Sequence, residues 1–148
     1  MNRIPPFHTL LELAGKSMDE AFSAVGEASA RQRAAEEQLL KLQGYRHEYV
    51  RGLQESMARG LLSSHCQNTQ HFISTLDDAI HKQSGILGQM QKQVVLERDR
   101  WMKARQKVSS MQALVKRDAE RVRQTSARLE QKSADEFAAR AHRRTHQA

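Results

Sequence analysis

The chain has 148 residues, of which 39% are hydrophobic, 28% are charged and only 5% are aromatic. Its formal net charge of +7 at pH 7 predicts an acidic partner. Such a partner can be an acidic protein surface, an anionic lipid or a nucleic acid. An alternating strand pattern, an apolar run that would cross a bilayer and the apolar stretch of a signal peptide are all missing, so we expect a soluble cytoplasmic protein.

The first half of the chain predicts one long helix from about Pro6 to Ala58. Pro6 suits the first helical turn, where its missing N–H has no intrahelical partner. Two columns of residues seven apart form a partly apolar edge: Leu11, Met18, Val25, Gln32, Leu39, Arg46 and Leu53 in one, and Ala14, Ala21, Ala28, Ala35, Leu42 and Tyr49 in the other. A heptad repeat of this kind makes a helix pack along a partner helix.

Residues 59–63 predict a turn between this helix and the next. Gly60 tolerates the left-handed conformation that ends a helix, and Ser63 or Ser64 can cap the following helix. A connection of a few residues returns the second helix antiparallel to the first.

The second half predicts a helix from about 64 to 142, followed by a basic tail at 143–148. Its seam column is apolar throughout and comprises Ile73, Ile80, Leu87, Val94, Trp101, Val108 and Val115. The predicted fold is therefore all-α: two long helices in an antiparallel coiled-coil hairpin, the second longer than the first, as a single domain over 1–148.

Unequal helix lengths leave the end of the second helix without a partner inside the chain. Folding the hairpin about Leu61 sets Pro6 opposite Lys116, yet the apolar column continues to Val122 and Leu129. The companion column is polar there: Asp118, Thr125 and Lys132. Such a stripe is too weak for a permanent dimer but suits a transient partner; the alternative is that this end frays.

Four polar residues interrupt the apolar columns: Gln32, Arg46, Gln83 and Glu97. Polar residues in a seam fix its register at some cost in stability, or they keep the hairpin loose enough to exchange partners. The sequence leaves both interpretations open.

A second apolar face on the later helix is formed by Phe72, Leu76, Ala79 and Gln83, which are spaced i, i+4, i+7 and i+11. The apolar surface is wider here than a two-helix seam requires. Either the face docks a partner, or the first helix covers it.

The sequence contains no catalytic constellation, phosphate loop or dinucleotide fingerprint, so we expect no enzyme activity and no cofactor. His65, Cys66 and His71 cluster near the turn, but their spacing is loose and a fourth ligand is not obvious, so we expect no metal site. Cys66 is the single cysteine and cannot form an internal disulfide, which fits a reducing compartment.

Four segments carry a resemblance to a known family. They are Glu36–Leu39, Tyr45–Tyr49, Gln70–Ile80 and Asp135–Ala141, in this order along almost the whole chain. Together with the length and the position of the turn, they make the chain resemble the FliJ family of flagellar type III export proteins.

The resemblance implies a long antiparallel coiled coil, similar to the two-helix part of the rotor subunit of rotary ATPases. It implies three partners: the central hole of the hexameric flagellar export ATPase, the cytoplasmic domain of the export-gate protein FlhA, and export chaperones. The protein would then couple ATP hydrolysis to export from the inner face of the cell membrane at the flagellar base, held there through its partners.

The resemblance also implies candidate site residues. The family's gate contact uses the face that here carries Phe72, Leu76, Ala79 and Gln83. The last position is commonly histidine in the family, and Gln83 lacks its titratable charge. The candidates for binding the ATPase lie toward the end of the second helix: Val122, Leu129, Arg140, Arg143 and Arg144.

The alternative function is a basic coiled-coil adaptor that binds nucleic acid or a membrane surface. From Lys116 to Ala148 the chain has nine Lys or Arg against five Asp or Glu, and the two signs are interleaved. A zipper-type DNA binder gathers its basic residues in one block. A single-strand binder supplies several stacking aromatic residues, whereas Phe137 is the one Phe, Tyr or Trp of this segment. We therefore expect no nucleic-acid partner.

Overall fold

The computed structural model describes residues 6–61 and 63–146, which form two α-helices, α1 (Pro6–Ala58) and α2 (Ser63–His146). The helices contain 53 and 84 residues and pack against each other, and the described part of the chain contains no strand. The predicted all-α hairpin with a longer second helix is confirmed. Within the same described residues, neither helix has a stretch that is long and apolar enough to span a membrane.

The helix ends differ from the prediction at both ends of α2: Ser63, which was predicted to belong to the turn, is already the first residue of α2. α2 continues through Arg143 and Arg144 to His146, where the sequence predicted a tail from residue 143. Leu62 of the predicted turn and residues 147–148 of the predicted tail lie outside the described residues.

Gly60 ends α1 in a Schellman motif. Its φ is 70°, and it is the only residue with a positive φ among those described. The N–H of Gly60 donates to the carbonyl of Met57 at 3.2 Å, and the N–H of Leu61 donates to the carbonyl of Ser56 at 3.1 Å. These two bonds satisfy carbonyls that the end of the helix leaves free, so the chain reverses within a few residues.

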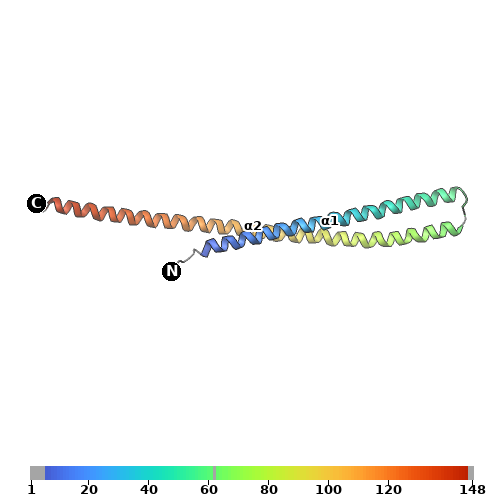
Figure 1. Ribbon diagram of the computed structural model, residues 1–148, viewed down its shortest axis with the longest axis horizontal. Coiled ribbons are helices and arrows are strands. Elements are labelled where there is room, and N and C mark those ends of the chain that lie inside the picture. Colours follow the sequence, from blue (N-terminus) through green and yellow to red (C-terminus); the bar gives the residue numbers. More distant parts are fainter. Residues whose placement is uncertain (1–5, 62, 147–148) are drawn as a thin grey trace. The chain divides into compact units, whose positions relative to one another are not determined.

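The chain divides into two compact units, which we describe separately. The turn unit comprises residues 19–103 and contains the turn with the adjoining parts of both helices. In this unit α2 returns antiparallel to α1 (Figure 1). The terminal unit comprises residues 1–18 and 104–148.

Small residues of α1 and larger residues of α2 form the core of the turn unit. Ala28 and Ala35 are buried on α1, and Leu76 and Val94 are buried on α2. The other seam residues of α2 in this unit are half-buried: Ile73, Ile80, Leu87 and Trp101. Alanine opposite a large side chain lets two helices approach closely, and the buried apolar surface holds them together.

The terminal unit has a shorter seam. Ala14 is buried on α1, while Val108 and Val115 are half-buried on α2. Phe7, in the first turn of α1, lines a groove with Leu114, Arg117, Asp118 and Arg121, so the start of α1 lies beside this part of α2.

Candidate functional site

The described residues contain no group of three or more His, Cys, Asp or Glu side chains that could hold a metal ion. Cys66 is a half-buried free thiol. The rings of His142 and His146 lie 4.2 Å apart on the exposed end of α2. The remaining candidate sites are exposed apolar and basic surfaces that suit another macromolecule.

The predicted face of Phe72, Leu76, Ala79 and Gln83 is only partly exposed. Leu76 is 7% exposed, Ala79 and Gln83 are half-buried, and Phe72 is 42% exposed. Leu76 and Gln83 each stand three residues after a seam residue, so they form the companion column of the seam and face α1. Of the two alternatives that the sequence left open, cover by α1 applies to Leu76, whereas Phe72 remains accessible.

Phe72 packs on Tyr49 of α1, with ring centroids 4.6 Å apart and an interplanar angle of 51°. Tyr49 is itself exposed. An aromatic pair of this geometry presents a large rigid apolar area to solvent. We call Tyr49, Phe72 and the groove beside them the turn-end surface.

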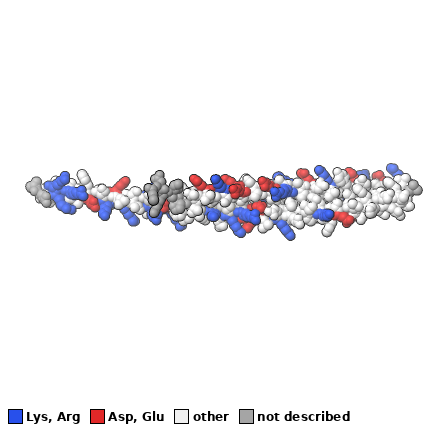
Figure 2. Space-filling view, turned by 60° about the horizontal axis from the view of Figure 1, so that its bottom comes forward, with Lys and Arg blue, Asp and Glu red and all other residues white. Residues whose placement is uncertain are grey.

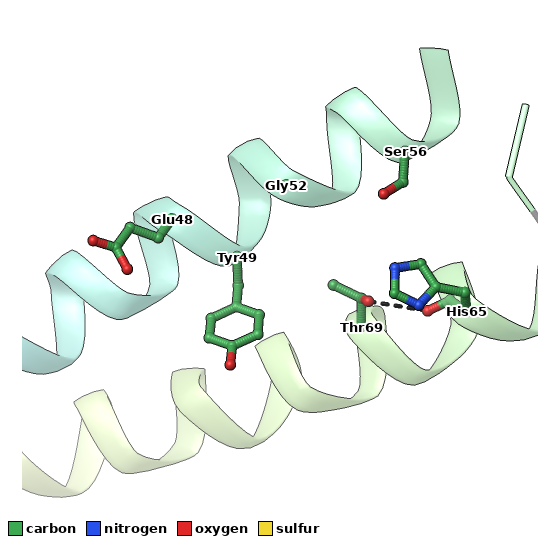
Figure 3. Close-up of a pocket in the computed structure, with 6 residues that line it drawn as sticks. All are labelled: Glu48, Tyr49, Gly52, Ser56, His65 and Thr69. Atoms are coloured by element: carbon green, nitrogen blue, oxygen red, sulfur yellow. Dashed lines mark hydrogen bonds between the residues drawn. The ribbon is translucent and has the colours of Figure 1, made fainter. Parts of the chain in front are cut away.

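The groove of the turn-end surface lies between the two helices and has a volume of ≈ 360 Å³. Tyr49 points from α1 toward α2, while His65 and Thr69 stand on α2 (Figure 3). Gly52 has no side chain and Ser56 only a short one, so neither closes the space between the helices. The remaining lining residue is Glu48.

Polar contacts across the hairpin set its register beside this surface. Arg46 of α1 forms an ion pair with Asp77 of α2. The side-chain amide of Gln83 donates to the carbonyl oxygen of Ala35 at 3.1 Å. Both residues interrupt the apolar columns, and both satisfy their polar groups on the opposite helix, which supports the register interpretation for these two positions.

The end of α2 forms the second candidate surface, and it belongs to the terminal unit. Every described residue from 119 to 146 is exposed. Val122, Leu129 and Phe137 are large apolar side chains among them, with 56%, 63% and 75% exposed. Arg140, Arg143 and Arg144 are exposed as well, and Figure 2 shows basic side chains gathered beside the C-terminal end.

The structure also reveals site residues that the sequence did not indicate. Gly52, Ser56 and Thr69 line the turn-end groove, although none of them carries an apolar or charged signal. In the sequence, the one indication of a groove was that Gly52 and Ser56 bring no large side chain close to the predicted seam. Phe137 is more exposed than Val122 or Leu129, but it lies outside their heptad column.

Comparisons with known proteins agree with the predicted resemblance. The family model described as "Flagellar FliJ protein" matches residues 2–147. The Flagellar FliJ protein of Escherichia coli (strain K12) is 35% identical over 133 residues, which cover 90% of this chain and 90% of that protein. The Flagellar FliJ protein of Salmonella typhi is 36% identical over 133 residues with the same coverage of both chains. This chain therefore belongs to the FliJ family of flagellar proteins.

Proposed function

We propose that this chain is a non-enzymatic component of the flagellar protein export apparatus. It binds the hexameric export ATPase through the end of α2 and the cytoplasmic domain of FlhA through the turn-end surface, couples ATP hydrolysis to export, and assists export chaperones. These partners hold it at the inner face of the cell membrane. The observation that carries the proposal is the exposure of the whole described stretch 119–146 of α2.

ATPase binding at the end of α2 is supported by two properties of this segment. Val122 and Leu129 continue the heptad column of the seam but have no cover, and exposed apolar side chains at regular spacing favour a partner surface. Arg140, Arg143 and Arg144 add positive charge near the end of the helix, which complements acidic loops of an ATPase pore.

The first experiment measures stimulation of the hexameric ATPase by the full chain and by the Val122→Asp/Leu129→Asp variant. We expect the variant to lose about tenfold or more in apparent affinity, because the charges would be desolvated in the interface. The Gln124→Asp/Gln131→Asp variant is the matched control, since it adds the same charge at other exposed positions of the same segment. Equal stimulation by the two variants contradicts ATPase binding through the apolar column.

FlhA binding is supported by the aromatic pair of Tyr49 and Phe72. Large aromatic side chains at an accessible surface are typical anchors of protein interfaces. Leu76 contributes differently, because it is buried against α1 and holds the surface in place.

The second experiment compares single variants for binding to the cytoplasmic domain of FlhA. Phe72→Ala should weaken FlhA binding by about tenfold, because an exposed aromatic ring is removed from the interface. ATPase stimulation should stay unchanged, because Phe72 is not part of the end of α2. Leu76→Ala should lower the free energy of unfolding by about 2–3 kcal/mol, since it leaves a cavity in the seam. The matched control is Phe22→Ala, because Phe22 is also an exposed ring that packs on another aromatic, Trp101, at 5.8 Å. An equal loss of FlhA binding in both phenylalanine variants refutes the assignment.

A further inference from the structure

A hollow on the surface of α2 is lined by α2 residues alone and lies within the turn unit. It has a volume of ≈ 570 Å³. Its lining residues are Gly88, Gln91, Lys92, Val95 and Leu96. Four of them are spaced i, i+3, i+4 and i+7, which is the arrangement of four residues that receives one side chain of a second helix in knobs-into-holes packing.

Gly88 keeps this hollow open. A Cβ atom added at Gly88 would meet no atom within 4 Å, so nothing inside the chain requires a glycine there. Glycine in the interior of a helix weakens the helix relative to alanine. The missing side chain instead leaves room for a side chain from outside.

The hollow is part of a heptad column that is distinct from the seam with α1. Gly88, Val95 and Met102 follow each other at intervals of seven residues, each one position after a seam residue. Val95 and Met102 are 65% and 63% exposed. A second apolar column beside the seam is what a helix needs in order to pack with two neighbours.

The charges beside this column select the partner. Lys92 lines the hollow, and Arg98 lies between Val95 and Met102 in the sequence. Neither forms an ion pair with another described residue, whereas Lys103 pairs with Asp99 at 3.1 Å and Arg100 pairs with Glu97 at 3.3 Å. A second copy that presented the same basic face would be repelled, while acidic flanks would be attracted.

We propose that the column of Gly88, Val95 and Met102, bordered by Lys92 and Arg98, docks an amphipathic helix of another protein with apolar residues at heptad spacing and acidic flanks. This inference goes beyond the proposed ATPase and FlhA contacts, because it uses none of their residues. It holds or fails independently of them.

The test uses the full chain and two labelled helical peptides of three heptads each. Both peptides carry leucine at the apolar positions; one has glutamate and the other lysine at the flanking positions, and like charges keep each peptide from self-association. We expect fluorescence anisotropy to show binding of the glutamate peptide and at least about tenfold weaker binding of the lysine peptide.

Variants of the chain locate the binding site. Gly88→Leu fills the hollow and should weaken binding of the glutamate peptide by about tenfold, whereas Gly44→Leu, at a helical glycine that also has open space around it, should not. The Lys92→Glu/Arg98→Glu variant should prefer the lysine peptide. Circular dichroism should show unchanged helicity in all variants, since leucine and glutamate are good helix formers.

Four results overturn the proposal. The first is equal affinity of the chain for the two peptides, and the second is equal affinity of Gly88→Leu and Gly44→Leu for the glutamate peptide. The third is a Lys92→Glu/Arg98→Glu variant that still prefers the glutamate peptide. The fourth is loss of glutamate-peptide binding in a Lys116→Glu/Arg117→Glu control, which would place the peptide on the terminal unit. Sedimentation tests for a fifth such result: a dimer of the unmodified chain that Gly88→Leu abolishes would identify a second copy as the occupant and would overturn the proposal.

Discussion

Glu97 is a charged side chain buried in the seam, with only 8% of its surface exposed. It stands in the companion column of the seam, and its carboxylate accepts hydrogen bonds from Gln93 at 2.8 Å and from Arg100 at 3.3 Å. Both donors belong to α2 itself. Glu97 therefore occupies apolar seam space without an ion pair or hydrogen bond to α1 among the described residues.

Replacement of this carboxylate by an apolar side chain should stabilise the hairpin. We expect Glu97→Leu to raise the free energy of unfolding by about 1–3 kcal/mol in urea titration, because a buried charge replaced by a well-packed apolar group is often stabilising. The control is Asp99→Leu, an exposed carboxylate paired with Lys103, which should change stability by less than about 0.5 kcal/mol. A lower urea midpoint for Glu97→Leu would show that the seam requires the carboxylate.

The sequence identified which residues interrupt the seam but not what they do. Arg46 and Gln83 are polar in apolar columns, and only the structure shows that Asp77 and the carbonyl of Ala35 satisfy them. The same limit applies to Leu76. Its spacing fits both a separate face and the companion column, and only the position of α1 distinguishes a docking residue from a core residue.

The two helices are the elements that the sequence predicted best. Heptad columns determine where a coiled coil forms, and Gly60 determines where α1 ends. The C-terminal end of α2 was predicted at about residue 142, which is too early, because the basic residues that follow were interpreted as a tail. Residues 130–146 contain neither Gly nor Pro, so nothing in this segment stops the helix before His146.

Two glycine substitutions should move stability in opposite directions. Gly44→Ala lies in the interior of α1 with open space around it, so it should raise the free energy of unfolding by about 1 kcal/mol. Gly60→Ala should lower it by about 1–2 kcal/mol, because its φ of 70° is left-handed. Thermal melting followed by circular dichroism measures both effects. A melting temperature of Gly60→Ala that is equal to or higher than that of the unmodified chain would contradict the role of Gly60 in ending α1.

Charge is divided unequally over the whole molecule. α1 carries six Lys or Arg against eight Asp or Glu, whereas α2 carries sixteen against nine. The net positive charge of the chain therefore comes mainly from α2, which also contains the exposed apolar side chains in the segment 119–146. The sequence predicted an acidic partner from the net charge, but it could not show which side chains stay uncovered, since cover depends on how far α1 reaches along α2.

Amide hydrogen exchange with and without the hexameric export ATPase tests the central claim most directly. In the free chain, residues 119–146 should exchange faster than seam residues 87–101, because an unpacked helix lacks tertiary stabilisation. Addition of the ATPase should slow exchange in residues 119–146 by about tenfold or more, since an interface suppresses local opening. Two results would contradict the claim that the end of α2 is unpacked in the free chain and binds the ATPase. One is exchange in this segment that is already as slow as in the seam, and the other is exchange that does not change when the ATPase is added.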